Sequence, residues 1–340
     1  MNCNPVGLKS GKLDVDVVVV TVLWRQRAGL TSYLHKQRTR PLAGVNIRCI
    51  EVFNEVQVGA SPGESVAELV DEALLHVWSG GNLGYAGGNN LGIECGSRIW
   101  SPRYWLILNP DVLIDIDAIE KLIATADSDP TAAVVGPLQQ LHQGAATKIR
   151  RGMRYFSLFS ILTPVYKANS RIDYLNGGAL LLRASAFDGD VQLPDWSFLF
   201  FEEIEICDRV RRSGYAVRVC EGSCVIHQEA GSRGSRCDDD YIPEVAEYFE
   251  NINALRFTRK NYPRRIVPVF LVRSILKPMV LLARGDVIRL RFWFLALKDF
   301  IFFRVSRFPF QLGWNPNLVN EKLVDVPWPR FAKFKNKSLV

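Results

Sequence analysis

A run of almost exclusively β-branched residues constrains the fold of this chain most strongly. Residues 15–23 read Val-Asp-Val-Val-Val-Val-Thr-Val-Leu, which predicts a buried strand. Further strands are expected over residues 46–53, 104–108, 132–136, 176–183 and 215–220. Helices are expected over residues 30–37, 65–76, 117–126 and 202–213. Strands that alternate with helices predict an α/β fold with a mainly parallel sheet and sites at the carboxyl ends of its strands.

The chain has 340 residues, of which 48% are hydrophobic. It can therefore bury one large core or two ordinary ones, and a mostly disordered chain is excluded.

Seven cysteines without dense spacing argue against a disulfide scaffold and favour a reducing compartment. Residues 1–14 lack the apolar segment of a signal peptide. The most apolar candidate for a membrane span, residues 266–283, is interrupted by Arg273, Lys277 and two prolines, so no transmembrane helix is predicted.

Three regions are expected along the chain. Residues 1–13 form a flexible N-terminus, residues 14–240 an α/β domain, and residues 241–340 a basic, aromatic, helical region. Within the α/β domain, residues 144–170 are less regular and are expected to form a loop-rich insertion. Residues 232–240 are polar and contain glycine, which is typical of a mobile loop at a domain boundary.

Charge is distributed unevenly between these regions. The last 100 residues contain 18 basic and 7 acidic residues, and the first 240 contain 24 and 28. A basic tail on an acidic body predicts an anionic partner, either a membrane surface or a nucleic acid. Arg273, Lys277 and Arg284 share one side of a helical wheel, as in an interfacial basic helix that Pro278 would kink. The alternative is a helical subdomain packed on the core. Nucleic acid is disfavoured, because the body is acidic and no nucleic-acid-binding module is present.

Glycines and asparagines are concentrated in the segment Gly80-Gly81-Asn82-Leu83-Gly84-Tyr85-Ala86-Gly87-Gly88-Asn89-Asn90. Such glycine density lets a backbone approach a ligand closely, and asparagine amides can bind a diphosphate or a sugar. The spacing fits neither a Walker A loop nor the dinucleotide-binding fingerprint. The alternative is a flexible turn that leads into a helix.

Two further segments contain acidic residues. Asn109-Pro110-Asp111 ends an apolar strand, where Asp111 can hold a divalent metal on a diphosphate or cap a turn. An aromatic run from Trp196 leads into four acids at a helix start: Glu202, Glu203, Glu205 and Asp208. Acids there gain from the helix dipole, but aromatic neighbours also desolvate a general base and raise its pKa.

In this order, the three segments resemble the GT-A glycosyltransferases of family 2, especially the bacterial rhamnosyltransferase-like branch, over about residues 14–260. The resemblance implies a Rossmann-like, mainly parallel sheet with flanking helices, followed here by the basic helical region. Glu203 matches the family's catalytic base, which is usually an aspartate, and Asp111 matches the last acid of its metal motif. His227, followed by a serine-bearing loop, resembles a further metal ligand.

The resemblance also implies a function and a set of site residues. It implies an inverting transferase that uses Mg²⁺ or Mn²⁺ and moves a sugar, such as L-rhamnose, from a dTDP- or UDP-linked donor. The acceptor is a saccharide or a polyprenyl-linked saccharide, used for cell-surface polysaccharide at the cytoplasmic face of the plasma membrane. The implied donor-binding residues are Thr21, Asn54, Asn82, Gly84, Asn90 and Asn109. The implied acceptor-side residues are Gly178, Trp196 and Glu202.

The chain departs from the family pattern at the positions that read the nucleotide base. The first strand ends in Thr21-Val22-Leu23-Trp24, where the family has Thr-Tyr-Asn, and the second ends in Phe53-Asn54, where it has Asp-Asn. A catalytically silent scaffold of the same fold at the membrane is therefore an alternative. A sugar nucleotidyltransferase is another, although residues 24–29 match its basic, glycine-rich loop poorly.

Zinc binding is a further alternative. The ligand types at Cys220, Cys224, His227 and Cys237 suit zinc, but their spacing fits no common finger.

Overall fold

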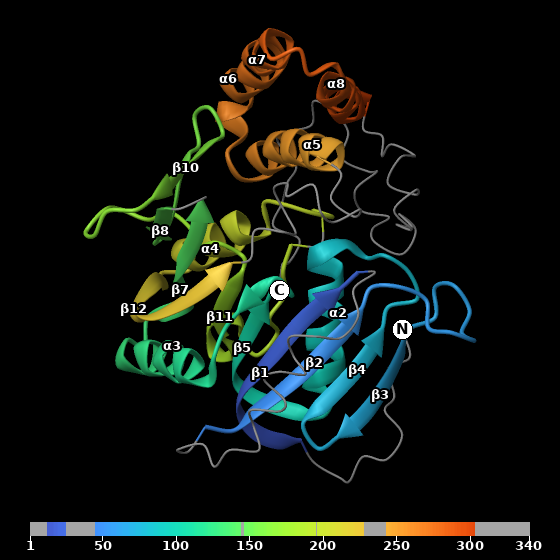
Figure 1. Cartoon of the computed structure of the whole chain (residues 1–340), viewed down its shortest axis with the longest axis vertical. Helices are drawn as coiled ribbons and strands as arrows, with labels where there is room; N and C mark the ends of the chain where they lie inside the picture. The colour runs from blue at the N-terminus through green and yellow to red at the C-terminus, as the bar shows by residue number, and fades with distance from the viewer. Residues whose placement is uncertain (1–11, 25–44, 144–145, 195, 228–242, 303–340) are drawn as a thin grey trace.

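The computed structural model describes residues 12–24, 45–143, 146–194, 196–227 and 243–302. The flexible N-terminus up to residue 11, the helix expected over residues 30–37 and the loop expected over residues 232–240 lie outside these ranges. The described part is α/β, as expected. Figure 1 shows a large twisted sheet with helices on both faces and a layer of helices beyond one end of it.

The main sheet has the strand order β3-β4-β2-β1-β5-β11-β7-β12-β6, with β8 paired to β7. Six strands run in one direction: β1 (Leu13–Leu23), β2 (Ile47–Phe53), β4 (Leu74–Trp78), β5 (Trp100–Leu108), β7 (Ala132–Gln143) and β12 (Ala216–His227). The opposite direction is taken by β3 (Val66–Asp71), β6 (Val112–Leu113), β8 (Ala146–Arg150) and β11 (Ala179–Arg183). The sheet is therefore mixed but mostly parallel.

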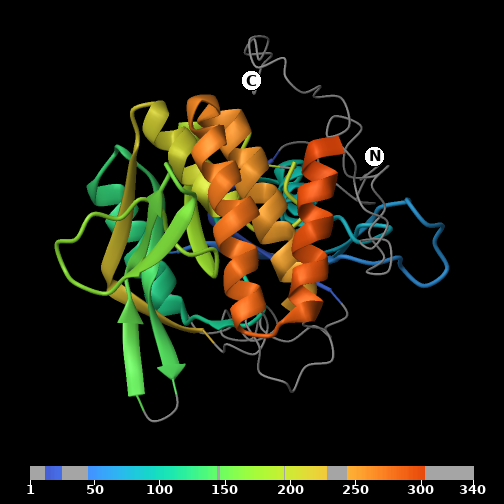
Figure 2. The same ribbon diagram turned by 90° about the horizontal axis from the view of Figure 1, so that it is seen from above.

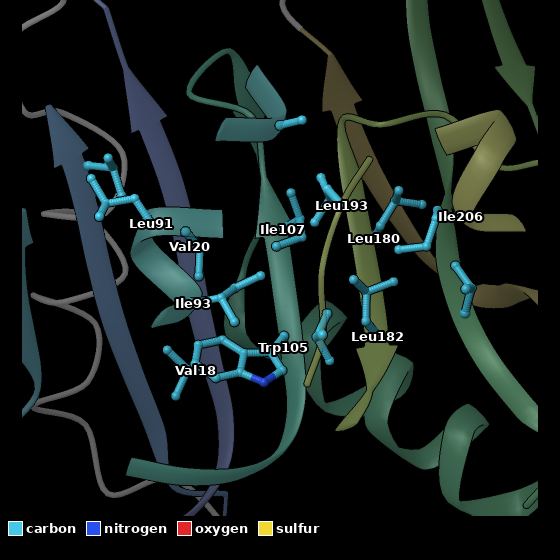
Figure 3. Close-up of a cluster of buried hydrophobic side chains, with 14 of the residues drawn as sticks. Val18, Val20, Leu91, Ile93, Trp105, Ile107, Leu180, Leu182, Leu193 and Ile206 are labelled. Atoms are coloured by element: carbon cyan, nitrogen blue, oxygen red, sulfur yellow. The ribbon is translucent and has the colours of Figure 1, made fainter. Parts of the chain in front are cut away.

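Helices cover both faces of the sheet. The buried face of α2 (Gly84–Ser97) packs with Val18 and Val20 of β1, in a cluster that also contains residues of α4 (Glu202–Arg212). Figure 3 shows side chains of this cluster lying between α2 and the strands. The alternate residues Val17 and Val19 belong to a second cluster, together with α3 (Ile116–Ser128). The β-branched run is thus buried on both faces, as its composition predicts.

The described part of the C-terminal region is helical, as expected. It contains α5 (Pro243–Asn261), a short 3-10 turn (Pro263–Arg265), α6 (Ile266–Leu271), a π-helical turn (Val272–Leu276), α7 (Lys277–Ala283) and α8 (Val287–Phe302). Figure 2 shows these helices side by side. Residues of α5, α6 and α8 share a third cluster, in which Phe198 contacts the buried side of the layer. Directly before Pro278, where a kink is expected, the helix has a π-helical turn, in which the Lys277 N–H donates to the Val272 carbonyl five residues back.

The helix expected over residues 65–76 is wrong, because this segment forms the hairpin of β3 and β4. Its apolar residues fit a helical spacing, yet Leu69 and Val70 are exposed while Leu75 and Val77 are buried. Pairing of β4 with β2 places Leu75 and Val77 in the core, and this tertiary contact overrides the local pattern.

The loop-rich insertion expected over residues 144–170 is also wrong. Strand β8 extends the main sheet at β7, and β9 (Gly152–Phe156) pairs with β10 (Ile161–Val165) in a separate hairpin.

Candidate active site

The most unusual backbone in the described chain directly precedes α4. Phe200 and Phe201 have φ angles of 69° and 79°, and bulky residues rarely adopt this left-handed region. Asn253 of α5, which is fully buried, donates from its amide to the carbonyls of Leu199 (2.8 Å) and Phe200 (3.3 Å). Strained backbone of this kind is typical of functional sites, where the surrounding structure must maintain it.

A cavity of about 170 Å³ lies at this turn. Its acidic residues are Glu202 and Glu203 at the start of α4 and Glu250 of α5. Its other lining residues are Tyr85, Asn109, Arg150, Met153, Leu162, Tyr174, Asn176, Gly177, Gly178, Leu199, Phe200, Phe201 and Ile204. The cavity therefore combines carboxylates with an apolar wall, which is typical of a site for an organic ligand.

The two neighbouring glutamates differ in environment. Glu202 is 1% exposed, and its Oε1 has no hydrogen-bond partner among the described residues. Burial, and then the charge of Glu203, raise the pKa of Glu202 well above its ordinary value. Glu203 is only half-buried, and its carboxylate lies against Gly177. When Glu202 holds a proton, Glu203 is the carboxylate of the pair that can accept one.

Tyr85 connects the glycine-rich segment to this pair. Its hydroxyl donates to the Gly177 carbonyl at 3.0 Å. Burial, followed by the charges of Glu203, Glu202 and Asp111, raises the pKa of Tyr85 well above its ordinary value. The phenol therefore stays protonated and keeps the peptide next to Glu203 in place.

Asn109 and Asp111 lie at the carboxyl end of β5, as expected, and Asn109 lines the cavity. The Asn109 N–H donates to the Gly178 carbonyl at 2.9 Å, which joins this turn to the strand beside it. His227 is paired by backbone register with Val112, and Asp111 directly precedes Val112, so the backbones of the two predicted metal-binding residues lie near one another. The side chain of His227 lies outside the described part of the structure.

Oxygen atoms suited to a hard cation are present at this turn. The half-buried carboxylate of Asp111 lies two residues from Asn109, whose buried Oδ1 has no hydrogen-bond partner among the described residues. Carboxylate and amide oxygens fit Mg²⁺ or Mn²⁺. Among the described residues, no group of three His, Cys, Asp or Glu side chains is close enough to hold a metal.

The zinc alternative is not tested, because Cys237 and the His227 side chain lie outside the described residues. Of its other members, Cys220 accepts a hydrogen bond from the Thr125 hydroxyl at 3.0 Å and contacts the Lys121 carbonyl of α3 at 3.4 Å.

The other predicted donor-binding residues line no part of the cavity. Asn54 donates to Asn82 Oδ1 (3.0 Å) and to the Gly84 carbonyl (3.1 Å), and accepts from the Leu83 N–H (2.9 Å). Asn90 exchanges two hydrogen bonds with the backbone of Leu193. These amides hold the segment before α2 and the segment before α4 in place.

Thr21 is fully buried in β1, and its hydroxyl has no hydrogen-bond partner among the described residues.

The glycine-rich segment leads into a helix, as in the alternative of a turn before a helix. From Gly84 onward it is helix α2. The φ of Gly84 is 73°, and a β-carbon there would overlap with the Phe198 carbonyl. The Tyr85 N–H donates to the same carbonyl at 2.8 Å. The segment thus sets the position of the strained turn.

On the predicted acceptor side, Gly178 and Glu202 line the cavity and Trp196 does not. The Trp196 indole donates to Glu205, which is also paired with Lys260 of α5 at 2.5 Å. Trp196 therefore belongs to a buried network behind the site.

Sequence reasoning missed several residues of the site. Tyr85, Asn176 and Gly177 line the cavity, and Asn253 holds the strained turn. The glycine-asparagine cluster contained a signal for Tyr85, and Asn176-Gly177-Gly178 at a strand start was a second one. Nothing in the sequence around Asn253 distinguishes it.

Two relatives of known activity are similar to part of this chain. The hexosyltransferase Agl10 of low-salt glycan biosynthesis from Haloferax volcanii is 28% identical over 161 residues, 46% of this chain and 52% of that protein. The N-acetylglucosaminyl-diphospho-decaprenol L-rhamnosyltransferase of Mycobacterium tuberculosis is 25% identical over 181 residues, 46% of this chain and 59% of that protein. The chain is similar to glycosyltransferases. The expected resemblance is thereby confirmed, although the chain spans only a little over half the length of these relatives.

Family models and solved structures were also compared with the chain. No family model matches the chain. The crystal structure of Staphylococcus aureus TarS residues 1–349 in complex with UDP-GlcNAc superimposes with a TM-score of 0.49 at 12% identity, covering 91% of this chain and 82% of that one.

Proposed function

We propose that this protein is an inverting glycosyltransferase, which moves a sugar from a nucleoside-diphosphate donor to a hydroxyl group of a saccharide or lipid-linked acceptor. The observation that carries the proposal is the position of Glu203. Its carboxylate lines the cavity beside Glu202, whose burial raises its pKa, in a chain that is similar to glycosyltransferases. A carboxylate at the wall of a largely apolar cavity is suited to general-base catalysis.

The reaction is a single displacement. An acceptor hydroxyl in the cavity gives its proton to Glu203 as its oxygen attacks the anomeric carbon. The bond from that carbon to the diphosphate oxygen breaks as the new bond forms, so the configuration inverts and the nucleoside diphosphate leaves. Gly177 and Tyr85 hold the base in position, because orientation within about 1 Å affects such rates strongly.

Asp111 and Asn109 would hold Mg²⁺ or Mn²⁺, with His227 as a further ligand on the neighbouring strand. Such an ion supplies positive charge against the leaving diphosphate. Thr21, Asn54, Asn82, Gly84 and Asn90 lie at or near the carboxyl ends of β1 and β2 or in the segment that follows β4. We assign them to the donor side, with the three amides positioning the backbone there.

The substrate classes follow from the relatives. One of them is named as an L-rhamnosyltransferase acting on a decaprenol-linked sugar, which favours a dTDP- or UDP-linked deoxysugar donor and a polyprenyl-linked acceptor. The corresponding process is the synthesis of cell-surface polysaccharide, and its location is the cytoplasmic face of the membrane. In this assignment, residues 14–240 contribute most of the transferase site. Residues 241–340 add Glu250 and Asn253 to it and form the membrane-facing region.

The test is transfer from dTDP- and UDP-linked sugars to a polyprenyl-linked saccharide, by wild type and by Glu203→Gln. Loss of a general base lowers the rate by about 10²- to 10⁴-fold, while nucleotide binding in a thermal-shift assay should persist. Glu94→Gln, an exposed position in α2, is the control and should transfer normally. Undiminished transfer by folded Glu203→Gln would contradict the assignment of the base. If no nucleotide raises the melting temperature with or without Mn²⁺, the silent scaffold becomes the better account.

A further inference from the structure

Large apolar side chains are exposed along one side of the C-terminal helices. The helical segment Pro263–Ala283 has 21 residues. Its most apolar window has a mean hydropathy of 2.0, and only 17% of that window is buried. By length and composition it is long and apolar enough to cross a membrane. Its exposed apolar residues are Val267, Leu271, Ile275, Leu276, Met279, Val280 and Leu282, and we call them the apolar face. In Figure 1, α6 and α7 lie at the outer edge of the molecule, beyond α5.

Arg273 and Lys277, two of the four cations in this segment, point into the protein, contrary to the basic interfacial helix expected from the sequence. Arg273 donates to the Ser160 carbonyl (2.8 Å) and to Asn251 Oδ1 of α5 (3.2 Å). Lys277 pairs with the buried carboxylate of Glu247 at 3.0 Å. These two cations are thus paired by the protein, and the side chains that the segment exposes are mostly apolar.

A second apolar patch lies next to this face. The turn between β9 and β10 exposes Phe156, Leu158, Phe159 and Ile161, which we call the hairpin tip. Two arginines of the helical segment hold the tip in place. Arg265 donates to the Ser157 hydroxyl, and Arg273 donates to the Ser160 carbonyl.

We propose that the apolar face and the hairpin tip insert together into one leaflet of an anionic lipid bilayer. Among residues 246–302, the charged side chains that are exposed are all cations: Arg264, Arg284, Arg291 and Lys298. The acids of the same range are buried or half-buried. Apolar side chains flanked by cations fit a hydrocarbon layer beneath acidic headgroups. If a second copy of this chain covered the same surface, the cations of the two copies would instead face and repel one another.

The same contacts favour insertion into one leaflet over crossing of the bilayer. A crossing helix would have to detach Arg273 and Lys277 from Ser160, Asn251 and Glu247 and carry both charges into the hydrocarbon core, where ionised groups are costly. In the docked arrangement both cations keep their partners on the protein side.

The hairpin connects this surface to the site. Met153 of β9 and Leu162 of β10 line the cavity with Glu203, while the tip of the same hairpin reaches the lipid. A lipid-linked acceptor could therefore enter the cavity without leaving the membrane surface. Only this acceptor route rests on the proposed function, because the docking itself requires no catalysis.

The test is flotation of the full-length chain with vesicles of phosphatidylcholine alone or mixed with phosphatidylglycerol, in the absence of donor and acceptor. We expect flotation with mixed vesicles at low and at high salt, because the apolar contact is not screened. Ile275→Asp with Met279→Asp, and separately Leu158→Asp with Phe159→Asp, should each weaken vesicle affinity by about tenfold or more. The matched control is Leu69→Asp with Val70→Asp on the exposed edge strand β3, which should float like wild type.

Each opposite result would overturn the proposal. Loss of wild-type binding at high salt would indicate purely electrostatic adhesion. Normal flotation of either variant would remove its patch from the interface. A dimer that Ile275→Asp converts to monomer, without vesicle binding, would identify a second copy as the occupant. Glu203→Gln must still float, so failure of the proposed chemistry and failure of the docking give different results.

Discussion

The carboxylate of Glu203 lies directly on the α-carbon of Gly177. A β-carbon built at Gly177 would overlap with Glu203 Oε1 and would lie 2.7 Å from its Cδ. No residue other than glycine can therefore occupy position 177 without moving the proposed base.

The first prediction concerns this contact. Gly177→Ala should displace the Glu203 carboxylate and lower kcat by on the order of 100-fold, the effect of about 1 Å of misplacement. Steady-state kinetics with a saturating donor measures it. Gly222→Ala is the control, since a β-carbon there meets only the Lys121 side chain at 3.8 Å. A folded Gly177→Ala variant with normal kcat would show that the position of Glu203 is not critical.

The second prediction concerns the strained turn at Phe200 and Phe201. Asn253→Ala removes the amide that binds the carbonyls of Leu199 and Phe200, so two buried acceptors lose their donor. Unfolding in urea should show a loss of about 1–3 kcal/mol, together with a fall in kcat. Asn261→Ala, at the end of the same helix and half-buried, should have a smaller effect on both. Equal effects of the two substitutions would argue against a special role for the turn.

The third prediction concerns the pH dependence of stability caused by Glu202. Because its pKa is raised in the folded protein, protonated Glu202 favours folding. This contribution is fully present below the ordinary carboxyl pKa of 4.5 and is lost as the pH rises through the folded pKa. Gln at this position cannot ionise, so Glu202→Gln does not lose this stability as the pH rises. Relative to wild type, the free energy of unfolding of the variant should therefore increase by up to about 1.4 kcal/mol per pH unit across that window.

Denaturation of both proteins from pH 4 to pH 8 would test the third prediction, with Glu68→Gln on the exposed strand β3 as the reference substitution. Parallel curves for wild type and Glu202→Gln would mean that Glu202 is charged in the folded protein.

Elements with strong local sequence signals were predicted correctly from this sequence. The β-branched run of β1 fixes a strand that is buried on both faces, because no exposed strand would tolerate it. The acids before Arg209 and the glycine at 214, whose φ is 85°, define α4 almost to the residue. These signals are local, and the structure agrees with them.

The errors have non-local causes. The segment of β3 and β4 has a helical spacing of apolar residues, but pairing with β2 decides its structure. Arg273 was expected to face lipid, yet Ser160, more than 110 residues away in the chain, supplies its partner. Asn54 and Asn82 have the residue type of ligand-binding groups, and their mutual hydrogen bond cannot be inferred from sequence.

The last prediction concerns the glycines of α2, which pack closely against other parts of the protein. Gly84, Gly88, Gly92 and Gly96 recur every four residues, and such residues share one face of a helix. A β-carbon at Gly92 would lie 2.7 Å from Val20 and 2.8 Å from Val52. At Gly96 it would lie 2.5 Å from the terminal methyl of Ile50 and 3.2 Å from the ring of Trp105. Valine methyl groups on a strand are stiff, but the end of an isoleucine can move.

Gly92→Ala should therefore destabilise the protein by about 1–3 kcal/mol through overpacking, despite the gain of about 1 kcal/mol in helix propensity. Gly96→Ala, in the same helix, should cost less than Gly92→Ala, because its shortest contact is with the movable end of Ile50, although the Trp105 ring must also shift. Urea denaturation of both variants measures the difference. If both substitutions stabilise the protein by the propensity difference alone, α2 lies farther from the sheet than these contacts indicate, and the glycines would then need a role in ligand binding after all.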